Sequence, residues 1–253
     1  MKHCRKIWLA VFASILLFYS CTEKKEGIQV AVAANFYSTM QAIADSFKAE
    51  HPDADIKIIK GSSGKLAGQI LNGAAFDIFL SADMEKAAAL YEKGFTKEEP
   101  VVYAKGALVL FTKNNIPLSP DLQTLTAGSI KHIAIANPIL APYGAAAVEA
   151  MRNSGVNIDT TKFVYGENII QTYQHIDMAA DVGFISKSLI LEDKTGNKYT
   201  EGKDWVEVNT SLYSPIEQGM IILNKDSELV RELYEFIQSD KVKEMIKESG
   251  YTF

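Results

Sequence analysis

The sequence has little cysteine: Cys4 and Cys21 are the only two in 253 residues, and both lie near the start of the chain. The remainder of the chain therefore has no disulfide and no cysteine-ligated metal centre. Histidine is also scarce, with four residues, and none of them shows the H-x-x-x-H spacing of a metal site. The chain after Cys21 must be held together by its core, for which 47% hydrophobic residues suffice.

An excess of positive charge is absent as well. Lys and Arg total 26 against 31 Asp and Glu, which gives a formal net charge of −5. This balance argues against nucleic acid or an anionic membrane face as a partner. Any anion that the protein binds must be captured by local geometry, because the overall charge repels it.

The first residues predict export. Lys2, Arg5 and Lys6 precede an uncharged apolar run at 7–19, which is too short to span a bilayer comfortably and is typical of a secretory signal. With the small Ser20 before Cys21, the arrangement resembles a bacterial lipoprotein signal. That resemblance implies a signal peptide at residues 1–20, a lipidated Cys21 and a short linker at 21–27.

The alternatives to this reading are an uncleaved membrane anchor or an ordinary signal peptide. Phe18 departs from the lipoprotein pattern, because such signals most often carry leucine there. We expect an exported, periplasmic protein that a lipid anchors to a membrane.

The body alternates between short apolar runs and helical patterns. Runs at 28–34 and 76–82 predict strands of a first series, and runs at 107–112 and 132–138 begin a second one. Such alternation predicts an α/β fold with mostly parallel sheets covered by helices on both faces. We expect two lobes with a cleft between them, the first formed by residues 28–106 plus 219–253 and the second by 107–218.

Four strand-to-helix junctions carry polar groups that suit a ligand. Ligands of open α/β sheets bind outside the carboxyl ends of the strands, where these junctions lie. Each junction alone is explained by helix capping or turn packing. Together they describe a dry pocket for a small oxyanion, built from helix N-termini and neutral donors without a cation. The residues concerned are Asn35, Ser62 and Ser63, Tyr143, and Ile169 with its two predecessors.

The stretch "GSSGKL" at 61–66 fits neither of two common motifs. A phosphate-binding Walker A loop would need Ser or Thr after Lys65, where Leu66 stands. A nucleophile elbow would need glycine at Lys65. A helix N-terminus that presents hydroxyl and N–H groups remains, either to an anion or as an ordinary cap.

The motifs of the body occur in an order that resembles the molybdate-binding proteins of ABC importers, from about Ile28 to the C-terminal "SGYTF". This resemblance implies a two-lobed periplasmic-binding-protein fold, type II-like, with mixed sheets and a two-strand hinge. It also implies binding of molybdate or tungstate and delivery to a permease and ATPase complex. We expect a monomer without cofactor or enzymatic activity. The motifs are "VAVAANF", "KGSSGKLAGQI", "GAAFDIFLSAD", "IANPILAPYGAAAVEAM", "ENIIQTYQHID", "DVGFIS" and "GMIILN".

The resemblance also implies a ligand set, in which molybdenum enters only as the oxyanion and no side chain binds the metal directly. Asn35 and Ser63 stand at the ligand positions of the first two loops, with Ser62 beside the latter. Tyr143 stands at a ligand position in its turn, through either its hydroxyl or its N–H. Ile169 stands where a backbone N–H contributes. Ser186 replaces a tyrosine that some members use, so its contact with the anion is left open. These residues form the predicted oxyanion site.

Other functions remain possible at this stage. A sulfate, phosphate or ferric-ion binder could share the fold, although a phosphate site would want a carboxylate acceptor and a ferric site clustered tyrosines. An exported serine hydrolase could use Ser63, but no histidine lies nearby in the sequence. A transcriptional effector domain would need a DNA-binding region where the leader stands.

Overall fold

The computed structural model describes residues 27–191, 199–224 and 226–253. The predicted signal peptide and Cys21 lie outside these ranges.

The strands are β1 Ile28–Ala33, β2 Ile56–Gly61, β3 Ile78–Leu80, β4 Val101–Gly106, β5 Leu108–Phe111, β6 Ile133–Ala136, β7 Phe163–Gly166, β8 Val182–Ser186, β9 Trp205–Glu207 and β10 Ile216–Ile222. The α-helices are α2 Tyr37–Glu50, α3 Ser63–Leu71, α4 Met84–Glu92, α5 Pro142–Asn153, α6 Ile169–Met178, α7 Lys187–Leu191, α8 Glu228–Ile237 and α9 Asp240–Glu248. Short 3₁₀ helices are η1 Ala34–Phe36, η2 Gln123–Thr126, η3 Thr160–Lys162 and η4 Thr210–Leu212.

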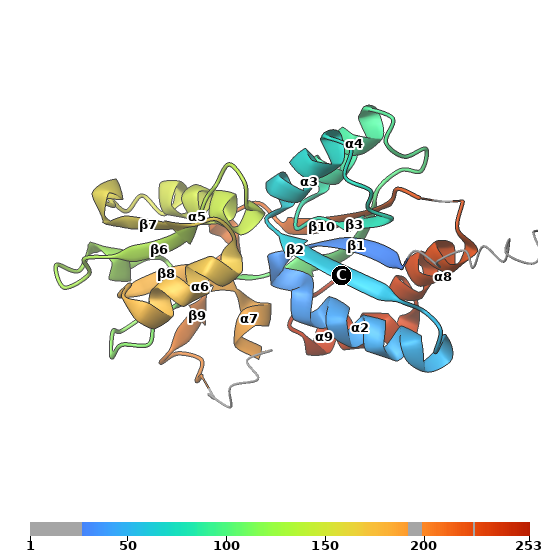
Figure 1. Cartoon of the computed structure of the whole chain (residues 1–253). Helices are drawn as coiled ribbons and strands as arrows, with labels where there is room; N and C mark the ends of the chain where they lie inside the picture. The colour runs from blue at the N-terminus through green and yellow to red at the C-terminus, as the bar shows by residue number, and fades with distance from the viewer. Residues whose placement is uncertain (1–26, 192–198, 225) are drawn as a thin grey trace, which may run out of the picture.

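The first lobe is built on a five-stranded sheet with the order β2-β1-β3-β10-β4. Strand β1 runs parallel to β2 and β3, whereas β10 is antiparallel to β3 and β4. Successive side chains of β1 point to opposite faces, as strand geometry requires. Val30 and Val32 join the core under α2, α8 and α9, and Ala31 joins the core under α3 and α4. Helices therefore cover both faces of this mixed sheet (Figure 1).

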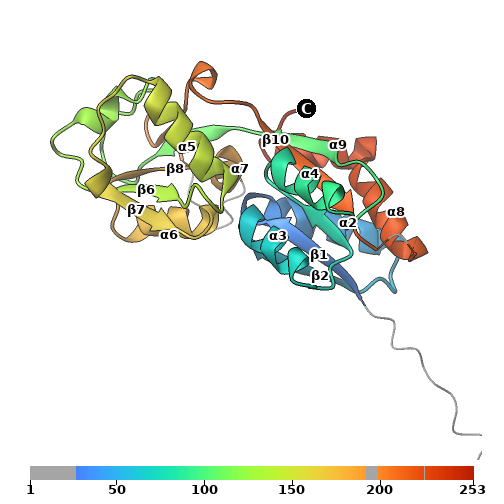
Figure 2. The same cartoon turned by 90° about the horizontal axis from the view of Figure 1, so that it is seen from above.

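The second lobe repeats the plan with the order β7-β6-β8-β5-β9. Strand β6 is parallel to β7 and β8, and β5 is antiparallel to β8 and β9. Helix α5 covers one face of this sheet and α6 the other (Figures 1 and 2). The core of this lobe extends to Ala33, Ala34 and Ala82 of the first lobe, which lie at the junction between the two.

The chain crosses between the lobes twice, which makes the two-strand hinge expected from the resemblance (Figure 2). One crossing is Ala107, between β4 and β5, and the other precedes β10. The predicted division placed residues 216–218 in the second lobe, but β10 begins at Ile216, which pairs with Gly106 of the first sheet. The polar Glu217 and Gln218 interrupt the hydrophobic pattern at the start of β10, so the sequence indicated only the second half of this strand.

In the described ranges, no helix combines the length and the apolar character needed to cross a bilayer.

Candidate functional site

A small cavity lies where the two lobes meet, at the carboxyl ends of β1, β2 and β3 and the starts of α5 and α6. Its volume is about 10 Å³, the room of about one water molecule, so the space between the lobes is narrow and excludes a sugar or peptide. No charged side chain is among the residues described as lining it. The lining consists of Ala33, Ala34, Asn35, Ser62, Ser63 and Ala82 from the first lobe, and of Ala141, Pro142, Tyr143, Asn168 and Ile169 from the second.

Ser62 and Ser63 stand at the start of α3 in different hydrogen-bonding situations. Ser62 occupies the N-cap position, but its side chain makes no capping bond. Its Oγ is buried and has no partner among the described residues. Ser63 Oγ accepts a hydrogen bond from the N–H of Ala82 at 2.9 Å, which leaves its hydroxyl proton to donate elsewhere. A buried hydroxyl without a partner costs free energy, so Ser62 is well placed to donate to a group bound in the cavity.

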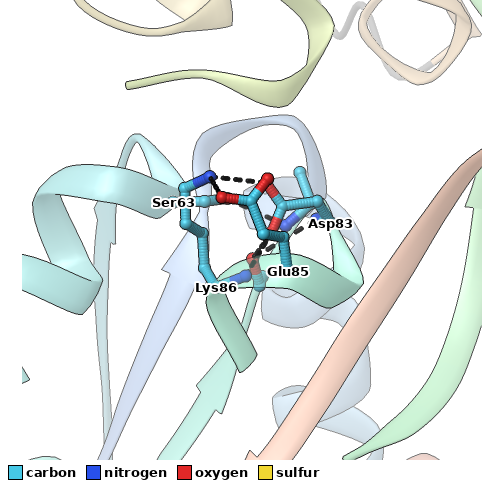
Figure 3. Close-up of polar contacts among 6 residues, drawn as sticks. Ser63, Asp83, Glu85 and Lys86 are labelled. Atoms are coloured by element: carbon cyan, nitrogen blue, oxygen red, sulfur yellow. Dashed lines mark hydrogen bonds and ion pairs between the residues drawn. The ribbon is translucent and has the colours of Figure 1, made fainter. Parts of the chain in front are cut away.

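The start of α4 lies next to Ser63 (Figure 3). Asp83 is the N-cap of α4 and accepts the N–H of Lys86 at 2.9 Å. The ammonium group of Lys86 lies 3.5 Å from Asp83 and 3.1 Å from Glu85. Burial acts to lower the pKa of Lys86, but the two carboxylates outweigh it and raise the pKa. The lysine thus remains protonated and balances the carboxylates of Asp83 and Glu85.

Asn35 lies in η1 and is buried, but its side chain does not cap a helix. Its Nδ2 donates to Gln218 Oε1 at 2.9 Å and to the hydroxyl oxygen of Tyr251 at 3.1 Å. Its carbonyl oxygen accepts from Tyr251 at 2.7 Å and from Ser188 at 3.1 Å. The amide nitrogen that could donate to an anion therefore faces residues behind the cavity.

Tyr143 is the second residue of α5, after Pro142 at the first helical position. Its hydroxyl lies 3.4 Å from Gln218 Nε2. The phenol thus extends from the second lobe into the hinge region, where β10 runs. Pro142 has no N–H, and that of Gly144 is bonded to the carbonyl of Ala141. The hydroxyl of Tyr143 thus faces Gln218, and its backbone, at the start of α5, is the other group that could serve the cavity it lines.

Ile169 begins α6, directly after the N-cap Asn168. The side chain of Asn168 accepts the N–H groups of Ile170 and Gln171, at 3.0 and 3.1 Å, and not that of Ile169. The first turn of a helix carries N–H groups without an intrahelical partner, together with a positive partial charge. Ile169 thus lines the cavity at a helix end that suits an anion.

Ser186 ends β8 and is fully buried. Its hydroxyl lies 3.0 Å from that of Ser188, which in turn reaches the carbonyl of Asn35. Ser186 is not among the residues that line the cavity. It belongs to the polar layer behind the site, together with Ser188 and Tyr251.

Sequence reasoning missed four residues of this polar layer, namely Tyr103, Ser188, Gln218 and Tyr251. The only local signal is Gln218, a polar side chain in an otherwise apolar strand. Tyr103 donates to Gln218 Oε1 at 3.0 Å, and burial is the main reason that its pKa lies well above the usual value. The phenol of Tyr103 therefore stays protonated at physiological pH and donates a hydrogen bond.

The lobes also touch directly beside the cavity. The N–H of Gly64 donates to the carbonyl of Leu140 at 2.9 Å. A β-carbon on Gly64 would lie 3.1 Å from this carbonyl oxygen, so glycine allows the close approach. Lys65, next along α3, forms an ion pair with Glu167 of the other lobe. The structure thus shows the lobes closed on each other.

A larger groove of about 480 Å³ runs beside the hinge, between α4 and α5. Four carboxylates line it, from Asp83, Glu85, Glu149 and Glu217, against one Lys86. This surplus of negative charge disfavours an anion, so the smaller cavity is the better candidate for an oxyanion site.

Other chemistries find little support in the described parts of the chain. No group of three or more His, Cys, Asp or Glu side chains there could hold a metal ion. No histidine lines the cavity with Ser63, so the described lining offers no base for a serine nucleophile. Asp77 and Asp83 lie at opposite ends of β3, so their carboxylates do not form an acid–base pair. Asp77 instead accepts from Gln29 and Asn224.

Known proteins resemble this chain in both sequence and fold. Residues 28–252 match the family model "Bacterial extracellular solute-binding protein". The molybdate-binding protein ModA of Azotobacter vinelandii is 36% identical over 239 residues, 92% of each chain. That of Rhodobacter capsulatus is 32% identical over 226 residues, covering 87% of this chain and 86% of the relative. The solved periplasmic molybdate-binding protein of Azotobacter vinelandii superimposes with a TM-score of 0.81 at 27% identity, over 89% of this chain and 99% of its own.

These findings confirm the resemblance, the two-lobed fold with mixed sheets and the expectation of a binding protein rather than an enzyme. The chain belongs to the bacterial extracellular solute-binding protein family, where it is related to periplasmic molybdate-binding members.

Proposed function

We propose that this protein binds molybdate, and with it tungstate, outside the inner membrane and delivers the anion to an ABC-type permease. The observation that carries the proposal is the buried hydroxyl of Ser62, which has no partner among the described residues and lies in an uncharged cavity between the lobes. The relatives named above bind molybdate, which selects this anion among those that the fold can accommodate.

In this proposal the anion is held by hydroxyl and backbone donors from both lobes. Ser62 and Ser63 donate through their hydroxyls at the start of α3, and Tyr143 and Ile169 donate through backbone N–H groups. Asn35 belongs to the first loop, and its side chain holds this loop in place through hydrogen bonds to Gln218 and Tyr251. Ser186 supports that loop through Ser188 and does not touch the anion.

A dianion needs only donors, and each charge-assisted hydrogen bond is stronger than a neutral one. Helix ends supply the compensating field, so no arginine is required. A protonated anion such as hydrogen phosphate also needs an acceptor, and no carboxylate is among the described residues that line the cavity. Selectivity against sulfate then rests on size, because a rigid site fitted to the larger molybdate would leave the oxygens of sulfate short of some donors.

A thermal-shift titration of residues 27–253 tests this function. Molybdate, tungstate, sulfate and phosphate are compared at equal ionic strength. A ligand at a thousand times its dissociation constant stabilises the folded protein by about 4 kcal/mol, which for this size is a rise in Tm of about 8–16 °C. We expect molybdate and tungstate to give this rise. Stabilisation by sulfate or phosphate alone would favour the corresponding oxyanion binder, and no response to any of the four would contradict the proposal.

We also propose that Cys21 carries a lipid anchor and that the protein is a monomer in solution. The basic start, the apolar run at 7–19 and Ser20 before Cys21 support the anchor. The full-length chain should incorporate labelled fatty acid and sediment with membranes, whereas Cys21→Ser should do neither. Equal labelling of both would contradict the assignment of Cys21. The leader-free body should elute at the mass of one chain in light-scattering chromatography.

A further inference from the structure

Gln218 lies where the Asn35 loop and the Tyr143 turn meet the hinge strand β10. It is fully buried in β10, next to a shift in the pairing of β10 with β4 at Gly219. Such an irregularity can re-aim a side chain out of the regular alternation of the strand. The result is a primary amide at the centre of a polar layer behind the cavity.

The two ends of this amide serve different lobes. Gln218 Oε1 accepts from Asn35 Nδ2 of the first lobe at 2.9 Å. Gln218 Nε2 donates to the hydroxyl of Tyr143, in the second lobe, at 3.4 Å. Asn35 and Tyr143 both line the cavity, while Gln218 does not. The amide thus joins one wall of the site to the other without touching the ligand space.

We propose that Gln218 is a positioning residue for anion binding, whose amide ties the Asn35 loop to the Tyr143 turn and so holds the lobes closed behind the anion. The inference rests on the proposed function, because it concerns the same cavity. In this arrangement the Tyr143 hydroxyl acts through Gln218, and only the backbone of Tyr143 contacts the anion. The bond between Gln218 and Tyr143 forms in the closed state, so its loss speeds opening and release of the anion.

The chain offers a matched control. Tyr103 also donates to Gln218 Oε1, at 3.0 Å, with the carbonyl oxygen of Ser81 as a second acceptor at 3.2 Å, but it lies on β4, within the first lobe. Tyr103→Phe and Tyr143→Phe each remove one hydroxyl bonded to the same amide. Only Tyr143→Phe cuts a bond between the lobes.

The experiment measures the molybdate dissociation constant and the dissociation rate of the leader-free protein by calorimetry and stopped-flow release. We expect Tyr143→Phe to raise both by about threefold to tenfold, the range of one neutral hydrogen bond, and Tyr103→Phe to change them less than twofold. Gln218→Leu should weaken binding at least as much as Tyr143→Phe. Adding Tyr143→Phe to Gln218→Leu should bring no further loss, because the partner is already gone. Denaturant midpoints of the unliganded variants show whether each one folds.

Three results would overturn the inference: wild-type affinity and release in Gln218→Leu, equal effects of the two tyrosine variants, or losses that multiply in the double variant. Multiplying losses would mean that the Tyr143 hydroxyl contacts the anion itself. If Gln218→Leu does not fold, Gln218→Met and the comparison of the two tyrosine variants decide the question.

A wild-type protein that binds none of the four oxyanions refutes the proposed function and this inference together. A wild type that binds, with a Gln218→Leu variant that binds equally well, refutes the inference alone.

Discussion

A β-carbon on Gly106 would lie 1.9 Å from the hydroxyl oxygen of Tyr143. Gly106 ends β4 at the first crossing of the hinge, and Tyr143 begins α5 in the other lobe. Glycine at this position therefore lets the phenol of one lobe reach the hinge strand of the other.

Gly106→Ala should lower molybdate affinity by about tenfold or more, because the methyl group must push the Tyr143 side chain away or keep the lobes apart. Calorimetric titration measures this loss. Gly128→Ala is the control, since a β-carbon there meets nothing within 4 Å. In a Tyr143→Phe background the loss from Gly106→Ala should be smaller, because the nearest clashing atom is gone. An affinity unchanged by Gly106→Ala would contradict the closed arrangement of these two residues.

Ser62→Ala and Ser63→Ala should separate ligand binding from folding. Ser62→Ala removes a hydroxyl without a partner among the described residues, so the unliganded protein should keep its stability while molybdate affinity falls by about tenfold to a hundredfold. Ser63→Ala also leaves the buried N–H of Ala82 unpaired, which should lower the free energy of unfolding by about 1–3 kcal/mol. Urea unfolding without ligand and calorimetry with molybdate give the two quantities. Equal loss of unliganded stability in both variants would contradict the different roles.

The sequence predicted the alternation of strands and helices and the loops that line the cavity between the lobes, because both follow from local patterns. Apolar runs followed by helical periodicity identify strand-to-helix junctions, and parallel strands bring these junctions to one edge. Asn35, Ser62, Ser63, Tyr143 and Ile169 were found in this way, and all of them line the cavity.

The directions of the side chains could not be predicted, because distant residues determine them. Asn35 has the local pattern of a helix cap, yet its amide bonds to Gln218 and Tyr251, which are 183 and 216 positions away in the chain. Gln218 itself looks like an exposed polar residue at the start of a strand. Only the packing of β10 between β3 and β4 buries it.

The ion pair between Lys65 and Glu167 joins the lobes at the rim of the site, where both side chains are about half exposed. Exposed pairs contribute little, about 0–1 kcal/mol, and salt screens them. Lys65→Met and Glu167→Gln should each weaken molybdate binding less than about fivefold at low ionic strength and less still at high salt. Titrations at two salt concentrations test this. A tenfold loss that persists in high salt would mean that Lys65 acts on the anion directly.

Binding should be nearly independent of pH in the neutral range. The described lining contains no carboxylate, histidine or lysine, and Tyr103 behind it stays protonated because burial, followed by the nearby Tyr143 and Asp83, raises its pKa well above the usual value. Molybdate titrations at pH 6, 7.5 and 9, at constant ionic strength, should therefore give dissociation constants within about a factor of two. A strong change over this range would indicate a titrating ligand in the site.

The same shift in Tyr103 predicts how stability depends on pH at the alkaline end. The folded protein holds the phenolic proton more tightly than the unfolded chain, whose tyrosine pKa is about 10. The contribution to stability is complete below pH 10 and is lost as the pH rises toward the folded-state pKa. Tyr213 and Tyr234 also have raised pKa values, mainly from burial, so the wild type alone cannot isolate Tyr103. Urea unfolding of the wild type and of Tyr103→Phe from pH 8 to 11 isolates the contribution of Tyr103. Above pH 10 the wild type should lose more stability than the variant. Parallel curves would contradict the burial of an ionisable phenol behind the site.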